Sequence, residues 1–78
     1  MSKYPSVTGK RLIKELLRVG YIFLRQKGSH VSIGHPKDKR IFAVVMDTPD
    51  DLCPETLHNI KKSLQLTRTE IIKILQDC

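Results

Sequence analysis

The sequence lacks several kinds of feature, and each absence excludes a class of protein. Only two cysteines occur, Cys53 and Cys78, and they form neither a C-x-x-C motif nor a Cys/His spacing typical of zinc. The longest unbroken apolar run, 41–46, has six residues, whereas a membrane helix needs about 20. The glycine patterns of dinucleotide-binding and P-loop domains are also missing. We therefore expect a cytoplasmic protein with free thiols, without a cofactor, a metal ion or a membrane helix.

The length and charge of the chain narrow the function further. Seventy-eight residues allow one small domain over 1–78, with 1–5 expected as a loose arm. Fourteen Lys and Arg residues against eight Asp and Glu give a net charge of +6. Residues 1–40 carry ten basic and two acidic side chains, hence +8, while 41–78 carry four basic and six acidic ones, hence −2. A basic half on a small domain is typical of a protein that binds a polyanion such as nucleic acid.

Local patterns predict the secondary structure. Thr8 can cap a helix that Gly20 ends, and Thr67 with Glu70 forms a capping box. The expected order is a helix over 8–20, strands over 21–27, 30–35 and 40–46, a helix over 54–64 and a short helix over 67–75. Short connections between the strands imply an antiparallel meander, since parallel strands need a long crossover. The sequence therefore predicts an α+β fold with helices on one face of a three-stranded sheet.

The second predicted strand indicates which sheet face is open. Val31 and Ile33 alternate with His30 and Ser32, so the two pairs point to opposite faces. We expect the valine and isoleucine against the helices and the polar pair on the solvent face. The third strand, 40–46, is too apolar for a strand that is wetted on one side. Either a partner covers one of its faces, or the strand is central and twisted.

The run Arg25-Gln-Lys-Gly-Ser-His30 is the most suggestive segment for chemistry. Its hairpin turn, Gly28 and Ser29, places a histidine beside Lys27 and Arg25. A neutral imidazole can take a proton near pH 7, and the two cations can hold a phosphate. RNA cleavage needs this combination, because a base must remove the 2′-hydroxyl proton and cations must stabilise the charged phosphorane. Read alone, a histidine at a strand start is more often a plain surface residue.

The chain resembles the HicA family of toxins, the messenger-RNA-cleaving partners in bacterial and archaeal toxin–antitoxin pairs. The resemblance extends over roughly residues 6 to 75 and is most specific in the Arg25-Gln-Lys-Gly-Ser-His30 run. The supporting segments are Ser6-Val-Thr-Gly-Lys10, Leu16-Leu-Arg-Val-Gly-Tyr21, His35-Pro36 and Pro54-Glu-Thr-Leu57 with Ile60.

The resemblance implies a fold, an activity and a partner. The fold is the double-stranded-RNA-binding-domain-like order of helix, three strands and helix. The activity is a type II toxin's metal-independent endoribonuclease, with His30 as the catalytic base and Gly28 and Ser29 in the turn beside it. A HicB-type antitoxin would bind the toxin and cover the site. Within this hypothesis Arg25 and Lys27 contact phosphate, and three basic residues of the first helix guide the RNA: Lys10, Arg11 and Lys14.

The sequence also departs from the family. Similar sequences commonly carry a proline and a second histidine at the end of the third strand, where this chain has Val44-Val-Met-Asp47, with neither. The loop with Asp47, Asp50 and Asp51 would repel phosphate if it lay near His30. Two alternatives therefore stay open: a non-catalytic RNA-binding or adaptor module, and a degenerate toxin kept for antitoxin binding. His35 and His58 are expected to pack in a turn and to lie on a helix surface, respectively.

Overall fold

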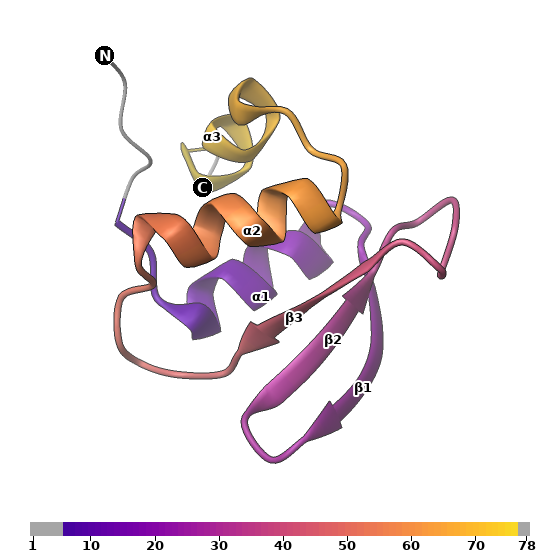
Figure 1. Cartoon of the computed structure of the whole chain (residues 1–78), viewed down its shortest axis with the longest axis horizontal. Helices are drawn as coiled ribbons and strands as arrows, with labels where there is room; N and C mark the ends of the chain where they lie inside the picture. Colours follow the sequence, from indigo (N-terminus) through magenta and orange to yellow (C-terminus); the bar gives the residue numbers. More distant parts are fainter. Residues whose placement is uncertain (1–5, 77–78) are drawn as a thin grey trace.

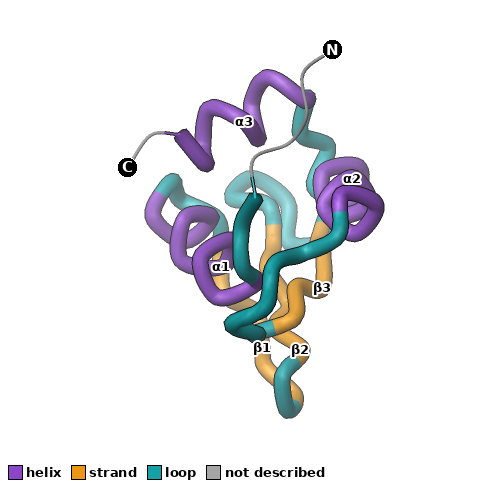
Figure 2. Tube along the Cα trace, turned by 90° about the vertical axis from the view of Figure 1, so that its left-hand side faces the viewer, coloured by secondary structure: helices purple, strands orange, loops and turns teal. Residues whose placement is uncertain are grey.

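The order of helices and strands confirms the predicted α+β fold. The computed structural model describes residues 6–76, so the expected arm at 1–5 and Cys78 lie outside the described residues. The elements are helix α1 (Gly9–Arg18), strands β1 (Ile22–Lys27), β2 (His30–Gly34) and β3 (Phe42–Met46), and helices α2 (Pro54–Ser63) and α3 (Arg68–Gln76). Helices α1 and α2 lie over one side of the sheet, and α3 lies beyond them (Figure 1, Figure 2). Within residues 6–76, no helix has the length and apolar character needed to cross a bilayer.

The helix starts follow the capping signals in the sequence. The Thr8 hydroxyl accepts a hydrogen bond from the Arg11 backbone N–H at 3.1 Å, and Pro54 occupies the first turn of α2. Thr67 and Glu70 form the predicted capping box, in which each side chain accepts a backbone N–H of the other residue at 2.9 and 3.1 Å. The Thr67 N–H is the main reason why the pKa of the Glu70 carboxyl lies below its ordinary value.

The sheet has the order β1-β2-β3, and both strand pairs are antiparallel. Val31 and Ile33 of the central strand pair with Val45 and Ala43 of β3, and all four side chains are buried. They belong to one continuous core with the buried apolar residues of α1 and α2, for example Leu12 of α1. The predicted inward and outward faces of β2 are therefore confirmed.

The third strand lies at the edge of the sheet, so the alternative of a central third strand is wrong. Its alternate residues Phe42, Val44 and Met46 are 49%, 47% and 44% exposed on the face away from the helices. An edge strand that presents apolar side chains and unpaired backbone groups is a template for association. The other interpretation, a face that a partner shields, is not tested by the strand order and stays a prediction.

An irregularity in β1 adds one more apolar residue to the open face. The register shifts between Phe23, opposite Ile33, and Arg25, opposite Ser32, which leaves Leu24 as an extra residue in a bulge. The Leu24 side chain lies over Gly34, where an added Cβ would be only 3.0 Å from its Cδ1 atom. The bulge thus turns Leu24 towards the open face, and Phe23 stays on the opposite side.

Candidate functional site

The face of the sheet away from the helices gathers most of the predicted site residues. Cross-strand pairing sets Lys27 and Met46 on either side of His30, and sets Arg25 and Val44 on either side of Ser32. Residues that are directly opposite in neighbouring strands share one face. This open sheet face therefore has two rows, each with a basic residue on β1, a polar residue on β2 and an apolar residue on β3.

The turn before His30 is held from both sides. Gly28 has a φ of 60° and Ser29 does not have a positive φ, which is the pattern of a type II′ hairpin turn with glycine in its first central position. The Gln26 side-chain amide donates to the Gly28 carbonyl at 2.9 Å, and the Asp47 backbone N–H donates to the Ser29 carbonyl at 2.6 Å. These bonds fix the point at which His30 enters β2.

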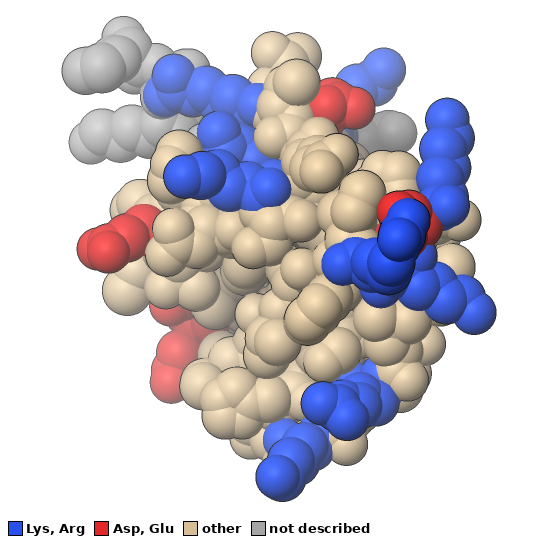
Figure 3. All heavy atoms as spheres, turned by 45° about the vertical axis from the view of Figure 1, so that its right-hand side comes forward, with Lys and Arg blue, Asp and Glu red and all other residues tan. Residues whose placement is uncertain are grey.

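His30 is exposed, and its neighbours suit an anionic ligand. The turn between β1 and β2 projects away from the helices (Figure 1), and His30, which follows it, is exposed to solvent. Among residues 6–76, none of the ion pairs involves Arg25 or Lys27, and both side chains are exposed. Figure 3 shows Lys and Arg side chains at the bottom, along the right-hand side and near the top of one face, with acidic groups at its left margin, near its top and among the right-hand basic groups. A base and two available cations on one face can together bind a phosphodiester and accept the proton of the neighbouring 2′-hydroxyl.

Lys10 and Asp47 meet at the end of β3, close to this turn. Gly9 packs so closely against the β3 backbone that a Cβ would overlap the Met46 carbonyl oxygen, and this contact brings the first turn of α1 beside the strand. The Lys10 ammonium then lies 3.1 Å from the Asp47 carboxylate. Of the three acidic loop residues, Asp47 is thus the one beside the Ser29 turn, and Lys10 offsets its charge.

Arg11 and Lys14 lie farther along α1, and Arg11 contacts another helix. Its guanidinium donates to the Leu75 carbonyl at 3.0 Å and lies 3.7 Å from the Glu15 carboxylate. Arg18 donates to the same carboxylate at 2.6 Å and to the Ile74 carbonyl at 3.4 Å. The structure therefore places Arg11 at the junction of α1 and α3 rather than on the open sheet face, while Lys14 is exposed on α1.

The remaining histidines and the cysteine have other surroundings. His35 is half-buried, its ring packs at a steep angle to that of Tyr21 with 5.8 Å between the ring centroids, and its Nδ1 accepts the Lys37 N–H at 3.1 Å, so it packs in a turn as predicted. His58 is exposed on α2, and Cys53 is a free, exposed thiol. Across the described part of the chain, no three His, Cys, Asp or Glu side chains gather closely enough to hold a metal ion.

Sequence reasoning missed a hollow on the open sheet face. It measures about 290 Å³ and is lined by Leu24, Arg25, Ser32, Lys39 and Phe42. The sequence predicts that Ser32 faces solvent and that Arg25 contacts phosphate. It assigns no role to Lys39 or Phe42, because the edge position of β3 depends on long-range strand pairing. The alternation of Phe42, Val44 and Met46 is the one local signal that could have found the apolar side.

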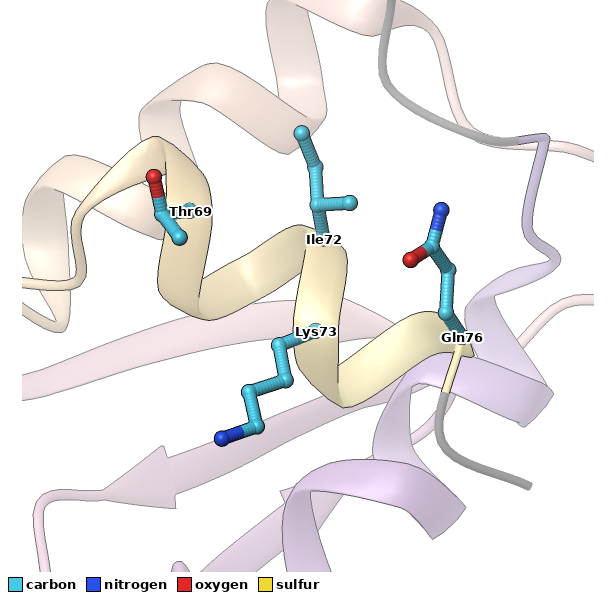
Figure 4. Close-up of a pocket in the computed structure, with 4 residues that line it drawn as sticks. All are labelled: Thr69, Ile72, Lys73 and Gln76. Carbon is cyan, nitrogen blue, oxygen red and sulfur yellow. The ribbon is translucent and has the colours of Figure 1, made fainter.

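A second hollow, of about 560 Å³, lies on α3 and is lined by Thr69, Ile72, Lys73 and Gln76. Figure 4 shows that these four side chains come from a single helix and spread apart instead of converging on one point. None of them belongs to the predicted site, so this surface adds nothing to the chemistry around His30.

The comparisons with known proteins show the family of the chain. The chain matches none of the curated proteins with which it was compared. A family model described as the HicA toxin of bacterial toxin–antitoxin systems matches residues 9–66, which is well over half of the chain and contains the whole sheet. The match ends before α3, so that helix lies outside the shared region. The chain belongs to the HicA toxin family.

Proposed function

We propose that the open sheet face cleaves messenger RNA as a metal-independent endoribonuclease, with His30 as the general base. The observation that carries this proposal is the exposed imidazole on a helix-free face, with Lys27 opposite it and Arg25 in the next row. Membership of a toxin family in toxin–antitoxin systems supports a role as the toxin. The activity, the role of each residue and the identity of the antitoxin are parts of the proposal.

The proposed reaction uses the nucleophile that RNA itself carries. The His30 imidazole takes the proton from a 2′-hydroxyl, and that oxygen attacks the adjacent phosphorus. The bond from phosphorus to the 5′ oxygen of the next nucleotide breaks, and this oxygen takes up a proton from water. The products are a 2′,3′-cyclic phosphate and a 5′-hydroxyl. Lys27 and Arg25 stabilise the negative charge that grows on the phosphate oxygens in the transition state.

The basic residues divide into two groups around this reaction. Lys27 and Arg25 are close enough to His30 in the register to act at the reacting phosphate, and the small Gly28-Ser29 turn lets the RNA backbone approach. Lys14 of α1 is exposed and can attract more distant phosphates, while the attraction that Lys10 exerts is reduced by its ion pair with Asp47. Arg11 is left out of this path because its guanidinium bonds to the Leu75 carbonyl.

The antitoxin is proposed to be of the HicB type and to cover the open sheet face. Support comes from Val44 and Met46, which are exposed on the edge strand, with Met46 directly opposite His30. A protein that buries these two side chains would necessarily cover the imidazole as well. Binding and inhibition would then be one event.

The test compares His30→Ala with His58→Ala, a matched change of an exposed histidine on α2. Both purified variants and the wild type are incubated with unstructured RNA in EDTA, and the product ends are identified. We expect the wild type and His58→Ala to give 2′,3′-cyclic phosphate ends, and His30→Ala to be slower by about 10²- to 10⁴-fold. Equal cleavage by His30→Ala would remove this residue from the mechanism.

The same assay separates the two alternative functions. Salt-dependent binding of RNA by the wild type without any strand scission supports the adaptor module. Absence of both binding and scission, with retained binding to the protein encoded by the neighbouring reading frame, supports the degenerate toxin.

A further inference from the structure

We propose that the hollow beside the His30 row binds one nucleotide of single-stranded RNA, with its base on Phe42 and its phosphate between Arg25 and Lys39. The inference rests on the proposed function, and it adds a specific position for the strand and the substrate class. It follows from the shape, the charge and the apolar lining of the hollow, each of which comes from described residues.

The position of the hollow is suited to a nucleotide next to the cleaved bond. Ser32 lines the hollow and lies two residues from His30 on the same face of β2, which corresponds to about 7 Å along the strand. Neighbouring nucleotides of an extended strand are separated by a comparable distance. An RNA strand that places its reacting phosphate at His30 would therefore place an adjoining nucleotide at Ser32.

The size of the hollow favours a single nucleotide. Its volume of about 290 Å³ lies just below the range for small-ligand pockets, which is about 300–1,000 Å³. The hollow lies on the open sheet face and is not lined by helices. A base inside a duplex has both of its faces stacked, so only an unpaired base can lie on Phe42.

The charge around the hollow favours an anion. Arg25 and Lys39 line it, and no ion pair among residues 6–76 involves either of them. The nearest acidic residue in sequence, Asp38, is paired with Arg40, whose guanidinium lies 3.2 Å from the Asp38 carboxylate. Two available cations without a facing carboxylate suit one phosphate group.

The apolar lining supplies a surface for a base. Phe42 is 49% exposed, and Leu24, whose side chain lies over Gly34, lines the same hollow. Stacking on an exposed aromatic ring strengthens the binding of an unpaired base, with little dependence on which base it is. Ser32 lines the same hollow, and its hydroxyl can bond to either the sugar or the base.

The cations distinguish this hollow from the rest of the exposed apolar strand. Val44 and Met46 could serve a protein partner alone, because apolar contact is sufficient for such an interface. Phe42 differs in sharing its hollow with two basic side chains. The combination of a ring and two cations is suited to a nucleotide, and a purely apolar partner would leave both charges without a counterpart.

The experiment measures binding of a fluorescent, fully 2′-O-methylated RNA oligonucleotide, which the protein cannot cleave because the attacking hydroxyl is blocked. Phe42→Ala is compared with Phe23→Ala, since Phe23 is 48% exposed but lies on the opposite side of the sheet. We expect Kd to rise about tenfold for Phe42→Ala, to be unchanged for Phe23→Ala and to be recovered by Phe42→Tyr.

A second pair of variants tests the site without altering a strand. Lys39→Gln changes a cation that lines the hollow, whereas Lys37→Gln changes an exposed lysine in the same turn that does not line it. We expect weaker binding and a smaller salt dependence only for Lys39→Gln. In addition, 4-thiouridine in the oligonucleotide should crosslink to the peptide that contains Phe42.

The outcomes separate this inference from the proposed function. If the wild type cleaves RNA but Phe42→Ala and Lys39→Gln bind as their controls do, the nucleotide site is refuted and the endoribonuclease remains. If Phe42→Ala and Lys39→Gln bind the oligonucleotide more weakly than their controls, but the wild type does not cleave natural RNA, the nucleotide site stands and the proposed endoribonuclease activity is refuted. Equal affinity for duplex RNA, or a Phe42→Ala defect confined to binding of the antitoxin, would also overturn the nucleotide site.

Discussion

The Lys10 ammonium lies 3.1 Å from the Asp47 carboxylate and joins the first turn of α1 to the residue that follows β3. A second link between the same segments is the hydrogen bond from the Lys10 backbone N–H to the Thr48 carbonyl at 3.0 Å. The side chains are 60% and 30% exposed, so the ion pair itself contributes little to stability. Its consequence is electrostatic, because it offsets a negative charge beside the Ser29 turn.

Removal of the Asp47 charge should strengthen RNA binding. In Asp47→Asn, Lys10 is released to contact a phosphate, so we expect a lower Kd for RNA. The slope of log Kd against log salt concentration should rise by about one, which corresponds to one more phosphate contact. Lys10→Ala should have the opposite effect, since it leaves the Asp47 carboxylate without its cation. Fluorescence anisotropy at several salt concentrations measures both. Asp50→Asn, an exposed change in the same loop, is the control, and an equal gain from it would attribute the effect to net charge alone.

The junction of α1 and α3 should weaken when the Glu15 charge is removed. Glu15 is only 8% exposed, and it binds the Arg18 and Arg11 guanidiniums that donate to carbonyls in the last turn of α3. Cations in that position also favour the negative end of the helix dipole. We expect Glu15→Gln to lower the melting temperature and to speed amide exchange in α3 before the sheet. Exchange that rises equally in β2 would show instead that the whole fold opens together.

Acid should destabilise the protein for a related reason. The pKa of Glu15 is lowered mainly by its hydrogen bond from Arg18, and that of Asp38 mainly by its hydrogen bonds from Arg40. A carboxyl with a lower pKa in the folded state stabilises that state above its ordinary pKa, and this stabilisation is lost as the pH falls through the folded value. We expect the melting temperature to fall once the pH drops below the ordinary carboxyl range. Glu15→Gln should flatten this decline, and an unchanged pH profile would contradict the role of the pair.

Local signals were enough to predict most of the fold. The caps at Thr8 and Thr67, the turn at Gly28 and the alternation of β2 each act within a few residues, so they can be read from the sequence directly. The same alternation placed His30 and Ser32 on the open side. The residues of the catalytic hypothesis lie within the short segment 25–30. Local alternation was therefore enough to predict that Arg25, Lys27 and His30 share one face.

Features that depend on distant pairing could not be predicted. The edge position of β3 follows from strand order, and the bulge at Leu24 follows from the register between two strands. Arg11 has the appearance of a wet-face cation in the sequence, but its partner Leu75 is 64 residues away. Lys10 and Asp47 are 37 residues apart. Such contacts form only when the chain folds, and no short sequence pattern predicts them.

The contact between Gly9 and the end of β3 should determine where the first turn of α1 lies. A methyl group at this position would overlap the Met46 carbonyl oxygen and would lie 2.9 Å from the Thr48 methyl group. Alanine is favoured over glycine in helices by about 1 kcal/mol, but overpacking against backbone costs about 1–3 kcal/mol. We therefore expect Gly9→Ala to lower the free energy of unfolding, measured with urea. Asn59→Ala, an exposed helical change without such a contact, should leave it unchanged or raise it slightly, and a Gly9→Ala variant as stable as the wild type would show that α1 can move away from β3 at little cost.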